Sequence, residues 1–231
     1  FNLRLARKLK ASGVPVLYYI SPTVWAWRRG RLKAIRDSVD RMLFIFPFEQ
    51  KIYDDAGIPA SFVGHPLLDK VTVRLGRDEF LDKHGLRGDP PIIGLLPGSR
   101  PSELRNHLPV LAEAADRLGR ETDAQFVLVL AESLSRAMVA RFLSGQGGRI
   151  RVLAEDGYEA MRYSSLVLSA CGTANLETAI LGTPFISFYR LSPLTYALGR
   201  PFVSVPHYAM ANLIAGREVV KELIQGDFRP D

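Results

Sequence analysis

Short apolar runs alternate with amphipathic stretches in the second half of the chain, and this alternation restricts the fold more than any other feature. The runs are three to five residues long and mostly apolar, as expected for strands buried on both faces. The stretches between them repeat apolar residues every three or four positions, as helices do. The predicted strands are 92–96, 126–130, 150–153, 166–168 and 185–189, and the predicted helices are 101–118, 133–143, 157–163 and 174–181. Strictly alternating strands and helices predict a parallel sheet covered by helices on both faces.

The first part of the chain repeats this alternation less completely. Its predicted helices are 2–11, 28–38 and 48–56, and its predicted strands are 16–20, 42–46 and 61–63. The fold class predicted is therefore α/β, with two Rossmann-like parallel-sheet domains of which the N-terminal one is incomplete. We expect the first domain over 1–68, the second over 69–231, and a hinge near 64–91.

Composition excludes several classes of protein. Of the 231 residues, 47% are hydrophobic and 23% are charged, which is typical of an ordered globular chain. No uncharged apolar run reaches about 18 residues, so no transmembrane helix is predicted. The single cysteine, Cys171, excludes an internal disulfide and fits a reducing compartment, so we expect a cytoplasmic protein.

Positive charge is concentrated at the front of the chain. Residues 1–36 contain nine Lys and Arg side chains and no acidic one, whereas the formal charge of the whole chain is +6. The remainder is therefore net negative. Such a basic front favours an anionic partner, namely a phospholipid surface, a phosphorylated substrate or nucleic acid. A plain solvated helix face is the alternative.

The loop after the predicted strand 92–96 has residues suited to binding phosphate. In parallel sheets, ligands bind beyond the carboxyl ends of the strands, where helices begin. Gly98 lets the backbone approach a ligand, and after Ser99 comes Arg100, whose guanidinium is always charged. The loop is not a Walker motif, because the second glycine and the Lys-Ser/Thr pair are absent. Taken alone, a tight turn with a surface arginine is the commoner explanation.

A second junction of this kind follows the predicted strand 166–168. Gly172 and Thr173 would open the next helix, and Glu177 would lie one turn further along, where a carboxylate can accept hydrogen bonds from ribose hydroxyls. A capped helix with a solvated glutamate is the alternative. A nucleophilic role for Cys171 is disfavoured, because no histidine in its local sequence would activate it.

A third stretch, 211–217, could bring Asn212 and Arg217 to the same edge of the sheet, although alone it indicates only a loop entering a helix. The four histidines and one cysteine show no metal-ligand spacing, so no metal is predicted. His65, which precedes a proline at the domain boundary, is interpreted as a hinge-packing residue rather than a general base.

Several strings of residues together resemble one family, the bacterial lipid-A-disaccharide synthases. They run essentially from end to end of the chain: YISPTVWAWR at 19–28, FPFE at 46–49, FVGHPL at 62–67, LLPGSRPSE at 95–103, GTANLE at 172–177, YRLSPLTY at 189–196 and NLIAGR at 212–217. The SPTVWAW and LSPLTY strings are unusual and therefore specific.

The resemblance implies glycosyltransferase architecture of the GT-B type, with an acceptor-side domain over 1–68 and a UDP-sugar-binding domain over 69–231. Members of the family join UDP-2,3-diacylglucosamine to 2,3-diacylglucosamine 1-phosphate (lipid X), with inversion, without a metal or other cofactor, and with release of UDP. The resemblance also implies that Arg100 holds the departing diphosphate. The implied substrate-binding residues are Gly98, Ser99, Arg100, Glu103, Gly172, Thr173, Asn175, Glu177, Asn212 and Arg217.

The chain departs from the family pattern at two places. Members have an Asp-rich segment, carrying the catalytic base, immediately before the Phe-Asn pair with which this sequence begins. We therefore expect residues 1–231 alone to lack the base and to be inactive. Members more often have Ser-Gly-Thr-Ala-Thr where this sequence has Cys171 to Asn175, which weakens the assignment of Asn175 but not of Gly172 or Thr173.

Lipid substrates imply a peripheral protein on the inner face of the bacterial inner membrane, acting in lipopolysaccharide biosynthesis, and a homodimer is compatible with this. The residues expected to meet the membrane or the acceptor are Trp25, Trp27, Arg28, Arg29 and Arg31. Core packing is an equal alternative for Trp25. No nucleic-acid partner is expected, because an interleaved aromatic and basic repeat is absent.

Two other functions remain open at this point. One is a UDP-N-acetylglucosamine 2-epimerase-like enzyme acting on a soluble sugar nucleotide, since such an enzyme has two α/β halves and phosphate-binding turns as well. The other is a non-catalytic nucleotide-binding module that uses the same basic front.

Overall fold

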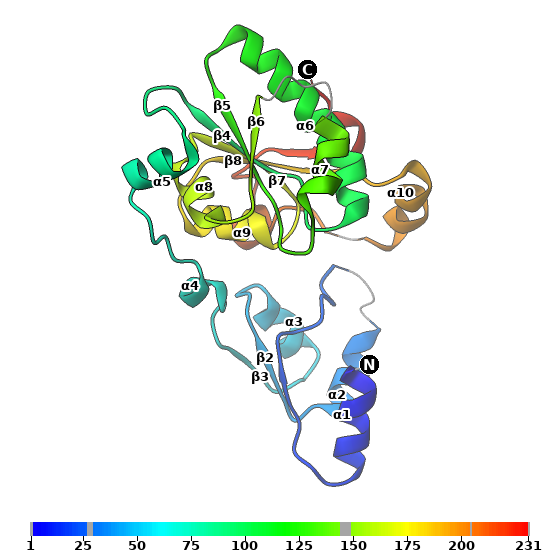
Figure 1. Ribbon diagram of the computed structural model, residues 1–231. Helices are drawn as coiled ribbons and strands as arrows, with labels where there is room; N and C mark the ends of the chain where they lie inside the picture. The colour runs from blue at the N-terminus through cyan, green and yellow to red at the C-terminus, as the bar shows by residue number, and fades with distance from the viewer. Residues whose placement is uncertain (1, 27–29, 144–148, 204, 231) are drawn as a thin grey trace. The chain divides into compact units, whose positions relative to one another are not determined.

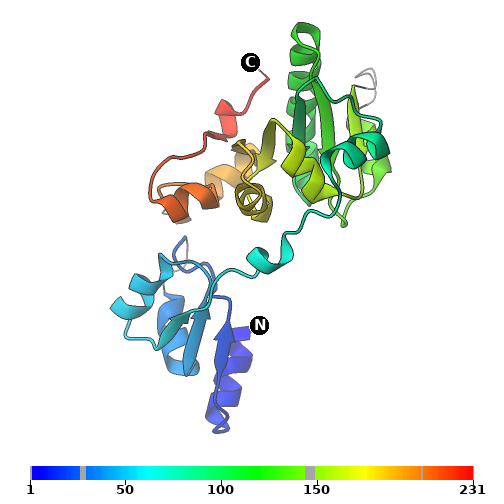
Figure 2. The same ribbon diagram turned by 90° about the vertical axis from the view of Figure 1, so that its left-hand side faces the viewer.

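The computed structural model describes residues 2–26, 30–143, 149–203 and 205–230 (Figures 1 and 2). Its contacts divide the chain into two compact units. Unit 1 comprises Phe1–Leu68 and Tyr196–Pro206, and unit 2 comprises Asp69–Thr195 and His207–Asp231. By its contacts, Tyr196–Pro206 therefore belongs with unit 1, although its place in the sequence lies within the predicted second domain.

Unit 2 is built on six parallel strands in the order β6-β5-β4-β7-β8-β9. They are β4 (Ile92–Leu96), β5 (Gln125–Val129), β6 (Ile150–Leu153), β7 (Leu166–Ala170), β8 (Phe185–Tyr189) and β9 (Glu222–Ile224). The chain adds β5 and β6 on one side of β4 and then returns to place β7, β8 and β9 on the other. This Rossmann order puts the carboxyl ends of β4 and β7 side by side, with Leu96 in register with Ser169.

Helices cover both faces of this sheet (Figure 1). On one face lie α6 (Pro101–Glu121) and α7 (Arg136–Leu143), and on the other lie α5 (Arg77–His84), α8 (Gly157–Tyr163) and α9 (Thr173–Ile180). In β4, Ile93 and Leu95 pack beneath α6, whereas Ile92 and Leu96 pack on the opposite face. Because both faces are covered, the strand is apolar at every position rather than at every second one.

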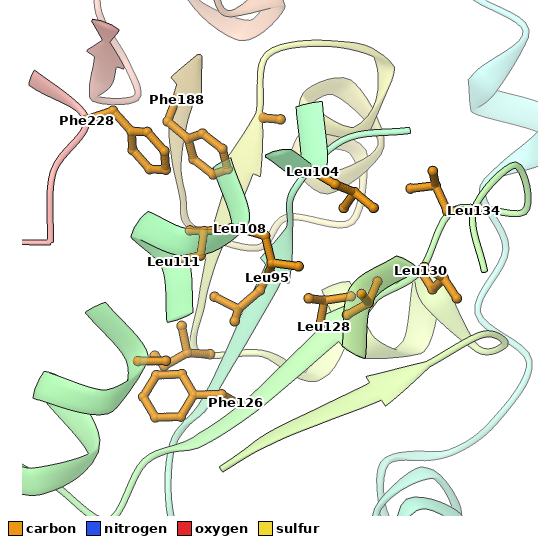
Figure 3. Packing of buried hydrophobic residues seen from close by; sticks show 14 residues of the cluster. Leu95, Leu104, Leu108, Leu111, Phe126, Leu128, Leu130, Leu134, Phe188 and Phe228 are labelled. Atoms are coloured by element: carbon orange, nitrogen blue, oxygen red, sulfur yellow. The ribbon is translucent and has the colours of Figure 1, made fainter. Parts of the chain in front are cut away.

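The largest core cluster lies between α6 and the sheet (Figure 3). Leu104, Leu108 and Leu111 are at most 1% exposed and project from one side of α6, three or four residues apart. Full burial of one such leucine stabilises the fold by roughly 1.5–3 kcal/mol. At the β8 end of the cluster, the Phe188 and Phe228 rings stack with centroids 4.2 Å apart.

Unit 1 is a smaller parallel sheet with the order β1-β2-β3. Its strands are β1 (Leu17–Tyr19), β2 (Arg41–Phe44) and β3 (Ala60–Phe62), and its helices are α1 (Asn2–Ala11), α2 (Arg31–Ser38) and α3 (Glu49–Asp55). Its core gathers around Ile35, Met42, Phe44 and Tyr53, none of which exposes any surface.

The remaining elements are short: α4 (Leu67–Lys70), α10 (Pro193–Gly199), η1 (Arg200–Phe202), α11 (Met210–Ala215) and η2 (Gln225–Asp227). In the part of the chain that the structure describes, no helix is both long enough and apolar enough to cross a membrane.

The predicted α/β fold class is confirmed, and each predicted strand is present within two residues of its expected ends. The sequence analysis missed α5 and β9, as well as the short helices α4 and α10 and the two 3-10 turns. The α5 helix has acidic residues in its first turn and ends at Gly85, which adopts φ 58°. Its buried residues, Phe80 and Leu81, are adjacent and show no helical repeat. The expected hinge near 64–91 thus includes a helix that belongs to the core of unit 2.

Candidate functional site

A pocket of about 330 Å³ opens at the carboxyl ends of β4 and β7. This is the switch point of the sheet, where the order in which strands are added reverses from one side of β4 to the other. Ligands bind at this point in open parallel sheets. The pocket is lined by seven of the ten residues predicted to bind substrate: Gly98, Ser99, Arg100, Glu103, Gly172, Thr173 and Glu177. A wider pocket of about 620 Å³ shares Ser99, Met161 and Glu177 with it and extends along the ends of β5 and β6.

The loop after β4 is shaped by the carboxylate of Glu103. Its Oε2 atom accepts hydrogen bonds from the backbone N–H groups of Ser99 (2.8 Å) and Arg100 (3.2 Å). Its Oε1 atom accepts one from the Arg100 guanidinium (2.9 Å) and one from the Tyr189 hydroxyl (3.3 Å). The Glu103 side chain is only 10% exposed. In this structure Glu103 therefore holds the loop, and it also lines the pocket in which it was predicted to bind substrate.

Gly98 is required by this arrangement. Its φ is +110°, a left-handed conformation that glycine adopts without strain. A Cβ atom at this position would lie 2.3 Å from Oε2 of Glu103. A side chain here would push aside the carboxylate that fixes the loop.

Arg100 presents positive charge to the pocket. Its side chain is 71% exposed, although one guanidinium nitrogen pairs with Glu103. A guanidinium has five N–H donors in a planar fork, so this pairing leaves donors for a bound anion. The pairing also restrains an otherwise flexible side chain beside the pocket.

The second junction offers backbone N–H groups rather than a side chain. The N-terminal N–H groups of α9 have no partner within the helix, and Gly172, Thr173 and Ala174 all line the pocket. No acidic residue occurs in the first turn of α9 and no side chain caps it. The positive end of the helix dipole is therefore available to an anion.

Glu177 lies one turn further along α9 and lines both pockets. Its Oε1 atom accepts a hydrogen bond from the Tyr158 hydroxyl at 3.2 Å. Burial, followed by the nearby charge of Glu177, raises the pKa of Tyr158, so the hydroxyl keeps its proton and donates. The carboxylate of Glu177 can accept further hydrogen bonds from a polyol such as ribose.

Cys171 is unsuited to nucleophilic chemistry. Burial raises the pKa of its thiol to about 12 and outweighs the opposing effect of the hydrogen bond between the thiol and the Ser187 hydroxyl. The Sγ atom lies 3.0 Å from the Ser187 hydroxyl. Because only the thiolate is reactive, a thiol that stays protonated is a poor nucleophile. This agrees with the sequence analysis, which disfavoured a nucleophilic role.

Asn175 and Asn212, also predicted to bind substrate, have side chains that are fully buried and bonded inside unit 2. The Asn175 amide donates to the Ser169 hydroxyl (2.8 Å) and accepts from the Ser187 hydroxyl (2.8 Å), thereby tying α9 to β7 and β8. The Asn212 amide donates to the Val220 carbonyl and to Glu222, and it accepts from two backbone N–H groups. Neither side chain lines the pocket; Arg217, an exposed residue just beyond α11, does not line it either.

Sequence reasoning missed two residues that stand behind the loop, Tyr189 and His107. Tyr189 donates to Glu103, and His107 contacts the carbonyl of Pro97. The sequence could have indicated His107, because it lies on the apolar side of the predicted helix, three residues after Leu104 and four before Leu111.

The residues predicted to meet the membrane or the acceptor are described only in part. Trp25 is half-buried and packs edge-on against Phe46 and Phe48, with ring centroids 6.5 and 5.3 Å apart. Arg31 opens α2. Trp27, Arg28 and Arg29 lie outside the described residues. His65 uses its Nδ1 atom to accept the Leu67 N–H and packs against Phe46, which fits the packing role.

Among the described residues, no group of three or more His, Cys, Asp and Glu side chains is placed to hold a metal ion.

The strand order and the pocket at its switch point define a Rossmann-like α/β protein, and its fold is of the GT-B type. The fold is similar to that of HepE from Anabaena in complex with UDP-glucose, with a TM-score of 0.55, 12% identity, and coverage of 97% of this chain and 62% of that one. It is also similar to UDP-GlcNAc 2-epimerase from Neisseria meningitidis bound to UDP-GlcNAc, with a TM-score of 0.56, 14% identity, and coverage of 93% and 63%. At such identities the likeness shows the fold alone.

The family follows from the sequence comparisons. A family model described as lipid-A-disaccharide synthetase matches residues 1–231. The chain is 45% identical to lipid-A-disaccharide synthase from Geobacter sulfurreducens, over all of this chain and 60% of the relative. It is 44% identical to the enzyme of that name from Solibacter usitatus, over 97% of this chain and 58% of the relative. The chain therefore belongs to the lipid-A-disaccharide synthase family, as the resemblance indicated, and spans about 60% of the length of these relatives.

Proposed function

We propose that this chain contains the UDP-sugar-binding part of a lipid-A-disaccharide synthase. The reaction would join UDP-2,3-diacylglucosamine to 2,3-diacylglucosamine 1-phosphate, giving the lipid A disaccharide 1-phosphate and UDP. The observation that carries the proposal is the pocket at the β4–β7 switch point, where Arg100 and the N-terminus of α9 face one cavity. Family membership supplies the substrate class.

The chemistry assigns a role to each wall of the pocket. The acceptor hydroxyl attacks the anomeric carbon of the donor sugar and loses its proton to a general base, while the bond from that carbon to the diphosphate oxygen breaks. Negative charge then grows on the diphosphate. The Arg100 guanidinium and the α9 N-terminus would stabilise this charge through hydrogen bonds and the helix dipole.

The remaining part of the donor is assigned by hydrogen-bonding chemistry. Glu177 lies one turn along α9 from the proposed diphosphate site and offers a carboxylate to ribose hydroxyls. Gly98, Gly172 and Thr173 would approach the diphosphate with backbone groups, because glycine and the first helical turn leave those groups accessible.

The epimerase-like alternative is not favoured. Its structural likeness is at 14% identity, whereas the lipid-A-disaccharide synthases are 43–46% identical over nearly the whole chain. Both kinds of protein would bind a UDP-sugar, so the two proposals differ in whether the sugar is acylated.

Binding of UDP tests the proposal directly. Isothermal calorimetry on residues 1–231 should detect UDP, and Arg100→Ala should weaken it by about tenfold to a hundredfold, the effect of losing a charge-assisted hydrogen bond. Arg105→Ala, which removes an exposed arginine of the same helix outside the pocket lining, is the matched control and should bind normally. Undetectable UDP binding by the unaltered chain would refute the proposal.

We further propose that the basic front brings the protein to the inner face of the inner membrane, where its lipid substrates reside. Trp25, Trp27, Arg28, Arg29 and Arg31 would contact anionic headgroups or the acceptor phosphate, and a homodimer would be compatible with this arrangement. Replacing Arg28, Arg29 and Arg31 together by Gln should reduce sedimentation with vesicles that contain anionic lipid. Unchanged sedimentation would remove the membrane role and leave the UDP site unaffected.

A further inference from the structure

His107 is a buried histidine that connects two strand ends behind the pocket. It lies on α6 and exposes none of its surface. Its Nδ1 atom is 2.7 Å from the carbonyl oxygen of Pro97, the residue that follows β4. Its Nε2 atom is 3.0 Å from the backbone nitrogen and 3.1 Å from the carbonyl oxygen of Arg190, the residue that follows β8.

These distances assign a single neutral tautomer. The Pro97 carbonyl can only accept, so Nδ1 carries the proton and donates to it. The Nε2 atom is then free to accept the Arg190 N–H. Burial lowers the pKa of His107, and the positive charge of Arg190 lowers it further. The hydrogen bonds to the Pro97 and Arg190 backbone and the negative charge of Glu103 act in the opposite direction. The other titratable group in ring contact is Tyr189, whose centroid lies 5.3 Å away.

The two strand ends that His107 joins stand on either side of β7. The sheet order places β7 between β4 and β8, and β7 leads directly into Gly172 and the N-terminus of α9. The end of β7 is itself fixed to β8, because the Cys171 N–H donates to the Phe188 carbonyl at 2.8 Å. A bond from α6 to both neighbours of β7 therefore fixes one wall of the pocket relative to the other.

Together with Glu103, His107 also holds the Pro97–Arg100 loop in place. Glu103 and His107 are four residues apart on α6 and so lie on the same side of the helix. Glu103 accepts the N–H groups of Ser99 and Arg100, which follow Gly98, and His107 donates to the carbonyl of Pro97, which precedes it. The flexible residue of the loop is thus held on both sides.

We propose that His107 is a positioning residue for nucleotide binding, which sets the place of the Pro97–Arg100 loop and its arginine relative to the N-terminus of α9. The inference rests on the proposed function, since it takes UDP as the ligand of the pocket. A purely apolar residue would fill the same space between Phe188, Tyr189 and Phe228, but it would leave the Pro97 carbonyl without its donor.

Three substitutions separate hydrogen bonding from packing. His107→Phe keeps the ring volume and removes both hydrogen bonds. His107→Asn keeps a donor at the position of Nδ1 and should therefore preserve the bond to Pro97. His107→Gln places its amide near the position of Nε2 and should preserve only the contact with Arg190. Leu111→Ala is the control, because it loosens the same helix in the core and touches no part of the loop.

The experiment is calorimetric titration of residues 1–231 with UDP, with thermal unfolding recorded for each variant. His107→Phe and His107→Gln should raise the Kd for UDP by about tenfold, while His107→Asn should stay within about twofold of the unaltered chain. Leu111→Ala should lower Tm without raising Kd. If His107→Phe binds UDP as tightly as the unaltered chain, or if His107→Asn binds as weakly as His107→Phe, the positioning role is wrong. If the unaltered chain binds no UDP, it is the proposed function that fails.

Discussion

The N-termini of α6 and α9 occupy equivalent places at the switch point, yet they present opposite electrostatic faces. At α6, the carboxylate of Glu103 already accepts the N–H groups of Ser99 and Arg100, so backbone donors are used within the loop. At α9, the first turn has no acidic residue and no capping side chain. The first junction therefore offers an anion a charged side chain, Arg100, whereas the second offers the backbone and the helix dipole.

This difference explains why the two glycines are not equivalent. Gly98 is confined by the Glu103 carboxylate and adopts a positive φ, whereas Gly172 is extended (φ 162°) with nothing within 4 Å of the position of a Cβ atom. Only glycine fits at position 98 without strain, whereas a larger residue would have room at position 172.

The largest effect is expected at the first of these positions. Gly98→Ala should destabilise the chain by about 3 kcal/mol, from backbone strain together with the clash against Glu103. Gly172→Ala should change stability by less than about 0.5 kcal/mol. Urea unfolding measures both, and equal losses in the two variants would contradict the contrast between the junctions.

A carboxylate placed in the first turn of α9 should make that junction resemble α6. Thr173→Asp should weaken UDP binding by about 30-fold, because its charge repels the diphosphate from a few ångströms away. The same change should stabilise the helix by roughly 0.3–1 kcal/mol, because it complements the dipole. Opposite signs in calorimetry and thermal unfolding therefore distinguish loss of the anion site from loss of the fold.

Thr173→Asn, which is neutral, is the control for that substitution. It should bind UDP within about threefold of the unaltered chain, since an uncharged side chain adds no repulsion. Equal weakening by Asp and Asn would show that charge repulsion is not the cause, and unchanged binding by Thr173→Asp would place the diphosphate away from the N-terminus of α9.

The smallest effect is expected at Cys171, which precedes α9. With a pKa of about 12 the thiol is almost entirely protonated at pH 8, so iodoacetamide should not alkylate the folded chain on a timescale of minutes. In urea it should react readily. The same shift in pKa makes stability depend on pH. The thiol ionises with a pKa of about 9 in the unfolded chain and of about 12 in the folded one. The stabilisation from the buried protonated thiol is therefore complete below pH 9 and is lost as pH rises toward 12. Rapid alkylation of the native chain would show that the turn is open.

Much of the site could be predicted from the sequence because its parts are local. A strand followed by Gly98 and Arg100, or by Gly172 and Thr173, defines a strand-to-helix junction from adjacent residues alone. Adjacent residues do not determine whether a polar side chain points into the pocket or into the core. Asn175 and Glu177 lie two positions apart at the start of one helix, and only Glu177 faces the pocket, while Asn175 turns toward β7 and β8.

The sequence by itself determined the fold class, the family and the two strand-to-helix junctions of the pocket, because hydrophobic periodicity and adjacent residues record which faces are buried and where helices begin. Only the tertiary structure decided that β4 lies beside β7, that Glu103 turns back onto its own loop, and that His107 joins Pro97 to Arg190. Each of these depends on which strands and helices meet across the sheet. A periodic pattern shows that an element has a buried face, but it does not identify the element that covers it.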